Sequence, residues 1–288
     1  MTILTTPIQI LLYICNSQVL FAMEITQLLG YFCALLIGVT LGVISGGGSI
    51  LAVPILAYLF HVDEKLATAY SLFIVGTSAL AGGIRQHFKG YVDWRTAVVF
   101  GIPAIIGVAV VRYFVVPRLP DILFTVGSLE FTRRMGMFGL FAVLMIPAAF
   151  SMLKERKDNS IAKTAVKYNY LLILLEGLLI GAVTGLIGAG GGFLVVPALV
   201  ILAKMRMKVA VGTTLVIIAF KSLIGFFIGD AFYLNINWQF LFSFTIISLV
   251  GIFIGTYLGN FINGKRLKKG FAYFIFVMAV FIFYMEFL

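Results

Sequence analysis

Charged side chains are scarce in this sequence. Asp, Glu, Lys and Arg make up 11% of its 288 residues, while 62% are hydrophobic and the mean hydropathy is +1.12. A soluble domain of this length needs a polar surface to stay dispersed, so the composition excludes that class. Transmembrane β-barrels alternate polar and apolar residues in strands of about 10 residues, and the apolar runs here do not alternate. The sequence therefore predicts an all-α membrane protein.

Residues that ligate metals or perform catalysis are also rare. The chain has two cysteines, Cys15 and Cys33, which lie in apolar stretches, and two histidines, His61 and His87, which fall in predicted loops. Their spacing matches neither a disulfide framework nor a zinc site. No Ser–His–Asp set and no catalytic pair of carboxylates stands out. We therefore expect no enzyme activity, no cofactor and no metal.

Basic residues outnumber acidic ones by 21 to 11, which gives a net charge of +10. They cluster in short loops between apolar runs, as the positive-inside rule requires, so they do not indicate a nucleic-acid partner. Runs that approach or exceed the ~20 residues of a membrane helix occupy 97–116, 170–188, 209–229, 238–262 and 271–287. We expect a multi-pass protein of the inner or plasma membrane. The sequence does not indicate its oligomeric state.

The chain contains two copies of one repeat. Residues 36–56 and 179–199 are identical at 11 of 21 positions with an offset of 143. Such self-similarity indicates a duplication. We divide the chain into membrane repeat 1 (27–153), a linker (154–167) and membrane repeat 2 (168–288). The N-terminal extension 1–26 is either an extra helix or a misassigned start, with Met23 as a second possible start.

Each copy is predicted to hold five segments, which gives about eight to ten membrane segments in all. An odd number per copy makes the two repeats inverted, related by a pseudo-two-fold axis in the membrane plane. The five pairs are 27–44 with 170–187, 49–60 with 192–203, 66–84 with 209–229, 95–116 with 238–262, and 135–153 with 270–287.

Loop charges agree with this scheme except in one region. The linker 154–167 and the loop 264–269 are rich in Lys and Arg and are predicted to be cytoplasmic, whereas the loop 230–237 has neither and is predicted to lie outside. Four arginines disagree, because they flank a loop that the scheme puts outside. They are Arg112, Arg118, Arg133 and Arg134.

Glycine clusters interrupt both copies, at 46–49 and at 190–192. Successive glycines are poor helix formers, so we expect the helix to break there. The short helix that follows begins with free N–H groups and a partial positive charge, which suits an anion. Inverted repeats would bring the two breaks together near the midplane. The candidate binding residues are Gly47, Gly48, Ser49, Gly190, Gly191 and Gly192. Glycines four residues apart, at 38, 42 and 46 and at 177, 181 and 185, have a different interpretation as helix-packing faces.

Lys221 is the only full cation that the sequence places deep in a predicted span. A charge at the bilayer centre costs at least ~2.5–3.5 kcal/mol and usually marks a functional site. The alternative is snorkelling to the outer face, which is ~12 Å away at 1.5 Å per residue. We predict that Lys221 binds the substrate. Its equivalent in the first repeat is Ser78.

The remaining candidates are weaker. Glu176 is a candidate for proton coupling, since an apolar setting favours its protonated form; the alternative is a role in helix packing or in contact with lipid headgroups. The hydroxyls of Ser71, Thr213 and Thr214 could donate to an anion, although Ser and Thr in membrane helices often bond their own backbone.

The pattern G-x3-G-x4-GG-x5-P, which runs from Gly38 to Pro54 and again from Gly181 to Pro197, resembles the sulfite exporter TauE/SafE family of membrane permeases. GTTL at 212–215 and KGYVDW at 89–94 extend the resemblance, which covers roughly residues 30–285. The resemblance implies about eight membrane segments and the movement of small sulfur-containing or organic anions, such as sulfite and sulfonates. We therefore expect a secondary transporter of a small anion. The alternative is a passive anion channel of the same fold.

Overall fold

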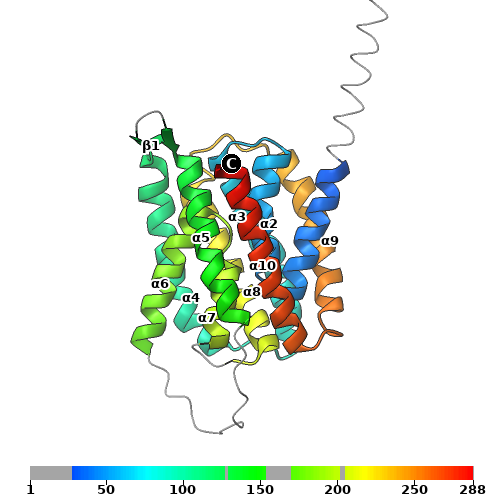
Figure 1. Cartoon of the computed structure of the whole chain (residues 1–288). Helices are drawn as coiled ribbons and strands as arrows, with labels where there is room; N and C mark the ends of the chain where they lie inside the picture. The colour runs from blue at the N-terminus through cyan, green and yellow to red at the C-terminus, as the bar shows by residue number, and fades with distance from the viewer. Residues whose placement is uncertain (1–27, 127–128, 154–169, 202–204, 288) are drawn as a thin grey trace, which may run out of the picture.

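The computed structural model describes residues 28–126, 129–153, 170–201 and 205–287. In this part of the chain the protein is a bundle of helices with one short β-hairpin at its edge (Figure 1). The N-terminal extension 1–26 and the linker 154–167 lie outside the described residues, so the expectations about them stay predictions.

Six helices in the described ranges are long and apolar enough to cross a membrane. At 1.5 Å per residue each exceeds the ~30 Å thickness of the hydrocarbon core. The predicted class, a helical membrane protein, is confirmed at this level. The six are α3 (Glu64–Phe88), α4 (Trp94–Val110, helical onward to Arg118), α5 (Arg133–Leu153), α8 (Met207–Gly229), α9 (Trp238–Leu258) and α10 (Gly264–Phe287).

The shorter helices form two pairs, and the two helices of each pair meet at a glycine cluster. The helix Leu28–Ile44 is followed by α2 (Gly47–Pro54), which continues as a π-helical turn over Ile55–Leu59. The helix α6 (Tyr170–Ile187) is followed by α7 (Gly192–Ile201). The second helices of the two pairs have 8 plus 5 and 10 residues. They are therefore about 20 Å and 15 Å long, too short to cross a bilayer.

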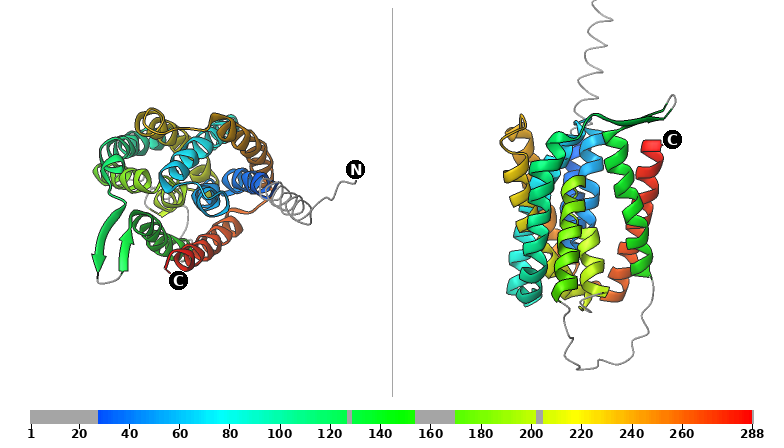
Figure 2. Two further views of the ribbon diagram at one scale, coloured as in Figure 1. Left: turned by 90° about the horizontal axis from the view of Figure 1, so that it is seen from above. Right: turned by 90° about the vertical axis from the view of Figure 1, so that its left-hand side faces the viewer.

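The most extensive helix contacts join the first half of the chain to the second. The pairs are α3 with α8, α5 with α10, and α4 with α6. The helix Leu28–Ile44 also crosses between the halves, because its glycines approach the backbone of α9 closely. The view from above shows α5 and α10 side by side at one edge of the bundle (Figure 2).

The four-spaced glycines allow two of these pairs to approach closely. A Cβ added at Gly42 would lie 2.6 Å from the carbonyl oxygen of Ile252 on α9, and one at Gly177 would lie 2.6 Å from that of Phe100 on α4. Side chains do not fit at such distances, so the packing role expected for these glycines is confirmed.

The bundle has two distinct ends. At the lysine end, Lys89 and Lys208 both donate to Asn260, at 3.0 and 3.2 Å. At the opposite, hairpin end, β1 (Ile122–Val126) pairs antiparallel with β2 (Leu129–Thr132) just before α5 begins. The connections α3–α4 and α9–α10 lie at the lysine end, and α8–α9 lies at the hairpin end (Figure 1).

Three of the four arginines that conflict with the loop charges have carboxylate partners at the hairpin end. The carboxylates balance the charges of these arginines at an end of the bundle that otherwise has few basic residues. The pairs are Arg112 with Asp230, Arg133 with Glu64 and Asp121, and Arg134 with Glu286.

We predict that the lysine end faces the cytoplasm. A chain with Cys15 and Cys33 replaced by serine should react with a membrane-impermeant maleimide added to intact cells when it carries Asn235→Cys, at the hairpin end. The same chain with Asp158→Cys, in the linker, should react only after the membrane is permeabilised. Labelling of position 158 in intact cells would contradict the orientation, and immunoblotting of both variants controls for expression.

Candidate functional site

The two glycine breaks touch each other. A Cβ added at Gly192 would lie 2.7 Å from the Cα of Gly46 and 2.7 Å from the carbonyl oxygen of Ser45. A Cβ at Gly46 would in turn lie 2.8 Å from the carbonyl carbon of Gly192. The backbones of the two halves are therefore in direct contact, which only residues without side chains permit.

This contact lies at mid-length of the central helix pair. A Cβ at Gly190 would lie 2.8 Å from Val75 on α3 and 3.6 Å from Ile218 on α8. Both residues are close to the middle of helices that have 25 and 23 residues. The breaks are therefore about equally far from the two ends of the bundle.

The breaks begin in the same way but differ in length. Ser45 and Gly188 occupy equivalent positions and both have positive φ, +57° and +71°. Their N–H groups donate to Leu41 and Thr184, the last such bonds of the preceding helices, at 2.7 and 2.9 Å. In the second break Gly190 and Gly191 also have positive φ, so α7 starts only at Gly192.

Gly47 and Gly48 are, in contrast, already helical. They open α2 and pack against the helix Leu28–Ile44, where a Cβ at Gly47 would lie 3.3 Å from Thr40 and one at Gly48 would lie 2.7 Å from Leu41. The buried Ser49 donates to the carbonyl oxygen of Gly46 at 2.8 Å. Both breaks are therefore tightly packed, but the second has the longer non-helical stretch of backbone.

Lys221 lies beside the second break. Its side chain is 1% exposed, and its ammonium donates to the hydroxyl of Thr184 on α6 at 2.8 Å. A Cβ at Gly191 would lie 2.6 Å from Nζ. Because Nζ points into the protein, the structure gives the interior position and not the snorkelling one.

The charge of Lys221 is only partly compensated. An ammonium has three N–H donors, and the described residues provide a hydroxyl for one of them. No carboxylate in the described part of the chain forms an ion pair with it. A buried cation without a counter-ion is unfavourable, so this position favours the arrival of an anion.

The other predicted polar residues are spread along the bundle. Ser71 and Thr214 are fully buried, and in the described part of the chain their hydroxyls have no hydrogen-bond partner. Ser78 instead bonds Ser248 on α9 at 2.9 Å. Thr213 accepts from the backbone N–H of Asp93 at 3.0 Å, which ties the α3–α4 connection to α8. Thr213 is therefore engaged toward the lysine end of the bundle.

Glu176 does not join this group. It is half-buried on α6, eight residues before Thr184, which corresponds to about 12 Å along the helix. The structure therefore separates the candidate for proton coupling from Lys221 by two helical turns.

Arg112 is the buried charge that sequence reasoning missed. Its side chain is 0% exposed, and Nη1 contacts both carboxylate oxygens of Asp230 at 3.0 Å. Its Nη2 lies directly against Gly188, the first residue of the second break. Two signals pointed to it in the sequence: it interrupts the apolar run 97–116, and it disagrees with the loop-charge scheme.

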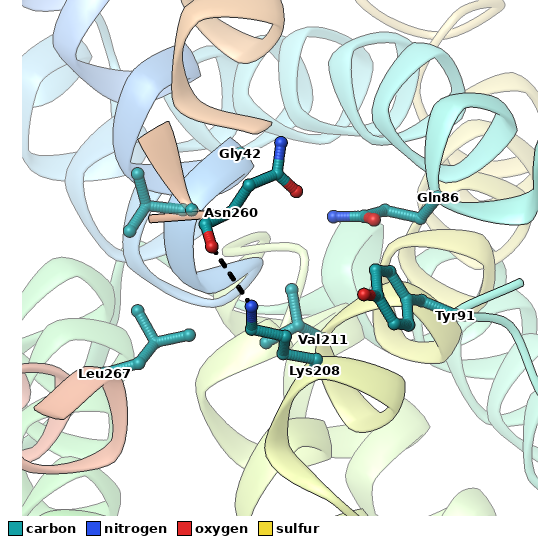
Figure 3. A pocket seen from close by; sticks show the side chains of 9 residues that line it. Gly42, Gln86, Tyr91, Lys208, Val211, Asn260 and Leu267 are labelled. Atoms are coloured by element: carbon teal, nitrogen blue, oxygen red, sulfur yellow. Dashed lines mark hydrogen bonds between the residues drawn. The ribbon is translucent and has the colours of Figure 1, made fainter. Parts of the chain in front are cut away.

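A small pocket opens at the lysine end (Figure 3). Its lining residues include Lys208, Gln86, Tyr91 and Asn260. The Oε1 of Gln86 is buried and accepts no hydrogen bond from the residues that the structure describes. The pKa of Lys89, next to this pocket, is lowered by partial burial and by the charges of Arg85 and Lys208. The lysine end therefore combines a recess with concentrated positive charge, which attracts anions.

The comparison with protein families agrees with the glycine pattern. A family model described as "Sulfite exporter TauE/SafE" matches residues 30–282. The chain belongs to the sulfite exporter TauE/SafE family. The resemblance carried by the duplicated glycine motif is thereby confirmed.

Similar proteins are named as membrane transporters. A "Probable membrane transporter protein" of Xylella fastidiosa is 29% identical over 257 residues, which cover 86% of this chain and 91% of that protein. A "Probable membrane transporter protein YdhB" of Bacillus subtilis is 26% identical over 230 residues, which cover 80% of this chain and 86% of that protein. No solved structure matches. This TauE/SafE protein is therefore a multi-pass membrane transporter.

The contact between Gly191 and Lys221 can be tested on stability. Gly191→Ala places a Cβ against Thr184 and Lys221, whereas Gly90→Ala adds one at nearly the same φ, +71°, with nothing within 4 Å. In both variants the alanine must adopt a left-handed conformation, which costs about 1–2 kcal/mol. We expect Gly191→Ala to lower the midpoint of thermal aggregation in detergent clearly more than Gly90→Ala. Equal decreases would mean that only backbone strain matters at Gly191.

Proposed function

We propose that this TauE/SafE protein is a secondary transporter that carries a small anion across the inner, or plasma, membrane. The substrate class is a sulfur oxyanion or organosulfonate such as sulfite, bound near the midplane at the glycine breaks. The observation that carries the proposal is Lys221: a fully buried ammonium, without a carboxylate partner among the described residues, that lies against the second break.

The matched helix pairs support an inverted repeat. Under the offset of 143, the contact of α4 with α6 corresponds to that of α9 with the helix Leu28–Ile44, while α3 with α8 and α5 with α10 each pair equivalent helices. Three long helices follow each pair of short helices. Because three is an odd number of membrane crossings, the second half would have the opposite orientation. A pseudo-two-fold axis in the membrane plane accounts for both features.

The proposed site combines partial and full positive charge. The N-terminus of α7 provides free N–H groups and roughly half an elementary charge, and Lys221 adds a full one. The unpartnered hydroxyls of Ser71 and Thr214 are further donors within the bundle. An anion that loses its hydration shell needs such compensation, because an unpaired charge in an apolar interior is strongly disfavoured.

Removing the charge of Lys221 tests this role. We expect Lys221→Met to insert and fold, because it keeps most of the apolar stem, but to lose most of its affinity for the anion. Lys221→Arg should keep part of it. Lys65→Met, the same change at the equivalent of Lys208 and outside the proposed site, should behave like the parent. The measurement is uptake of a panel of labelled anions by proteoliposomes, at a series of concentrations.

Parental uptake by Lys221→Met would contradict the charge-compensation mechanism while leaving transport itself intact. The same vesicles distinguish a transporter from a passive channel. Saturable uptake with counterflow supports the transporter, whereas linear flux driven by voltage supports the channel.

Coupling to protons is proposed through Glu176, and it is tested separately. If Glu176 carries the proton, an imposed pH gradient should stimulate uptake by the parent and have little effect on Glu176→Gln, which cannot ionise. Uptake in the absence of a gradient should be similar for both proteins. Equal stimulation of the two would assign Glu176 a packing role.

A further inference from the structure

Arg112 uses only part of its hydrogen-bonding capacity. Nη1 donates to Oδ1 and Oδ2 of Asp230, both at 3.0 Å, whereas Nε and Nη2 are buried and have no hydrogen-bond partner among the described residues. Of the five N–H donors of a guanidinium, Nε carries one and Nη2 carries two, so these three make no hydrogen bond to the described residues. Each buried donor without an acceptor costs about 1–3 kcal/mol. The free edge of Arg112 is therefore an unfavourable feature that a ligand would relieve.

The geometry of this edge selects a class of ligand. Nε–H and one Nη2–H of a guanidinium point in parallel, and they match two oxygens of a carboxylate or phosphate group in a bidentate pair. A sulfonate or sulfite presents oxygens in the same way. A monatomic anion such as chloride cannot accept both bonds with this geometry. The free edge therefore suits an oxyanion.

Arg112 and Lys221 flank the same break. Nη2 of Arg112 lies against Gly188 and Nζ of Lys221 lies against the position of a Cβ at Gly191. On α8, a Cβ at Gly229 would collide with Arg112, and Gly229 is eight residues, about 12 Å, beyond Lys221 toward the hairpin end. The backbone of Arg112 is thus displaced from Lys221 by two helical turns along the axis of the bundle, and its guanidinium extends from there to Gly188.

The pocket at the lysine end has its counterpart at Arg112. Gly42 and Gln86 line that pocket, and their equivalents under the offset of 143 are Gly185 and Gly229. Gly229 touches Arg112, and a Cβ at Gly185 would lie 3.4 Å from Val111 beside it. The side chain of Arg112, which comes from the first half, therefore packs against the residues of the second half that are equivalent to the lining of the recess.

We propose that Arg112 forms a second anion subsite, on the hairpin-end side of Lys221, which holds an oxyanion on its Nε–Nη2 edge. The subsite rests on the proposed transport function and deepens it: the anion would pass between Lys221 and the hairpin end by way of Arg112. Asp230 keeps the guanidinium in place and neutralises part of its attraction. Weak binding suits a transit site, because the anion must also leave.

Sided measurements in proteoliposomes test the subsite. The variant is Arg112→Lys, which keeps the charge and removes the two-donor edge. The control is Arg118→Lys, at the same end, where the arginine donates to the carbonyl of Phe114. The probe is methanesulfonate, added on either side of vesicles of known orientation, with chloride as a monatomic comparison. The half-saturating concentration is measured separately for the two faces.

We expect Arg112→Lys to raise the half-saturating concentration of methanesulfonate at the hairpin end by about tenfold or more, as for the loss of a charge-assisted hydrogen bond. The value at the lysine end, and inhibition by chloride, should change little. Arg118→Lys should resemble the parent. No change at the hairpin end, or an equal change at both faces, would overturn the subsite.

Two further results, misfolding of Arg112→Lys and a parent that transports no anion, can be told apart from loss of the subsite. If Arg112→Lys aggregates on size-exclusion chromatography, Arg112→Gln combined with Asp230→Asn removes both charges of the pair and should show the same one-sided loss. A parent that transports no anion of the panel would reject the proposed function itself. A parent that transports, with a variant of unchanged sided affinity, would reject the subsite alone.

Discussion

Backbone N–H and C=O groups that a helix break releases cannot stay exposed to lipid, and this requirement organises the whole bundle. The two breaks bury each other, with Gly46 against Gly192, and the middle of α3 and α8 covers them. The small-residue faces of Leu28–Ile44 and α6 then draw α9 and α4 close on either side. A non-helical segment is thus held at mid-depth by helices that are mostly apolar and carry a few buried polar side chains, such as Thr184 and Lys221, beside it.

The two buried cations next to this segment are stabilised in different ways. Arg112 has a carboxylate, Asp230, on one side of its guanidinium, whereas Lys221 has a single hydroxyl, Thr184. Burying an ion costs several kcal/mol unless a counter-charge and hydrogen bonds compensate for it. The charge of Lys221 is therefore the less compensated of the two, and the anion proposed to bind at the break would neutralise it. This difference favours Lys221 as the main binding residue and Arg112 as the weaker one.

Much of this arrangement is visible in the sequence, because the relevant signals are local or repeated. The offset of 143 identifies equivalent helices, the four-spaced glycines predict the packing faces, and the apolar run 209–229 around Lys221 predicts its burial. The different backbone conformations of the two breaks are not visible in the sequence. The equivalent positions 47 and 190 both hold glycine, yet Gly47 is helical and Gly190 has positive φ. Arg112 was missed for a similar reason: its partner Asp230 is 118 positions away, and a single sequence does not reveal such a pair.

The pairing of helices across the two halves also bears on how such a chain could have arisen. Every extensive helix contact described above crosses from one half to the other, so half of the chain alone would leave its small-residue faces and its glycine break without a partner. In the inverted repeat proposed above, two half-length copies satisfy each other because one is inserted in the opposite sense. On that proposal, an ancestor of one repeat would have been a dual-topology homodimer, and fusion of its genes would have fixed one copy in each orientation.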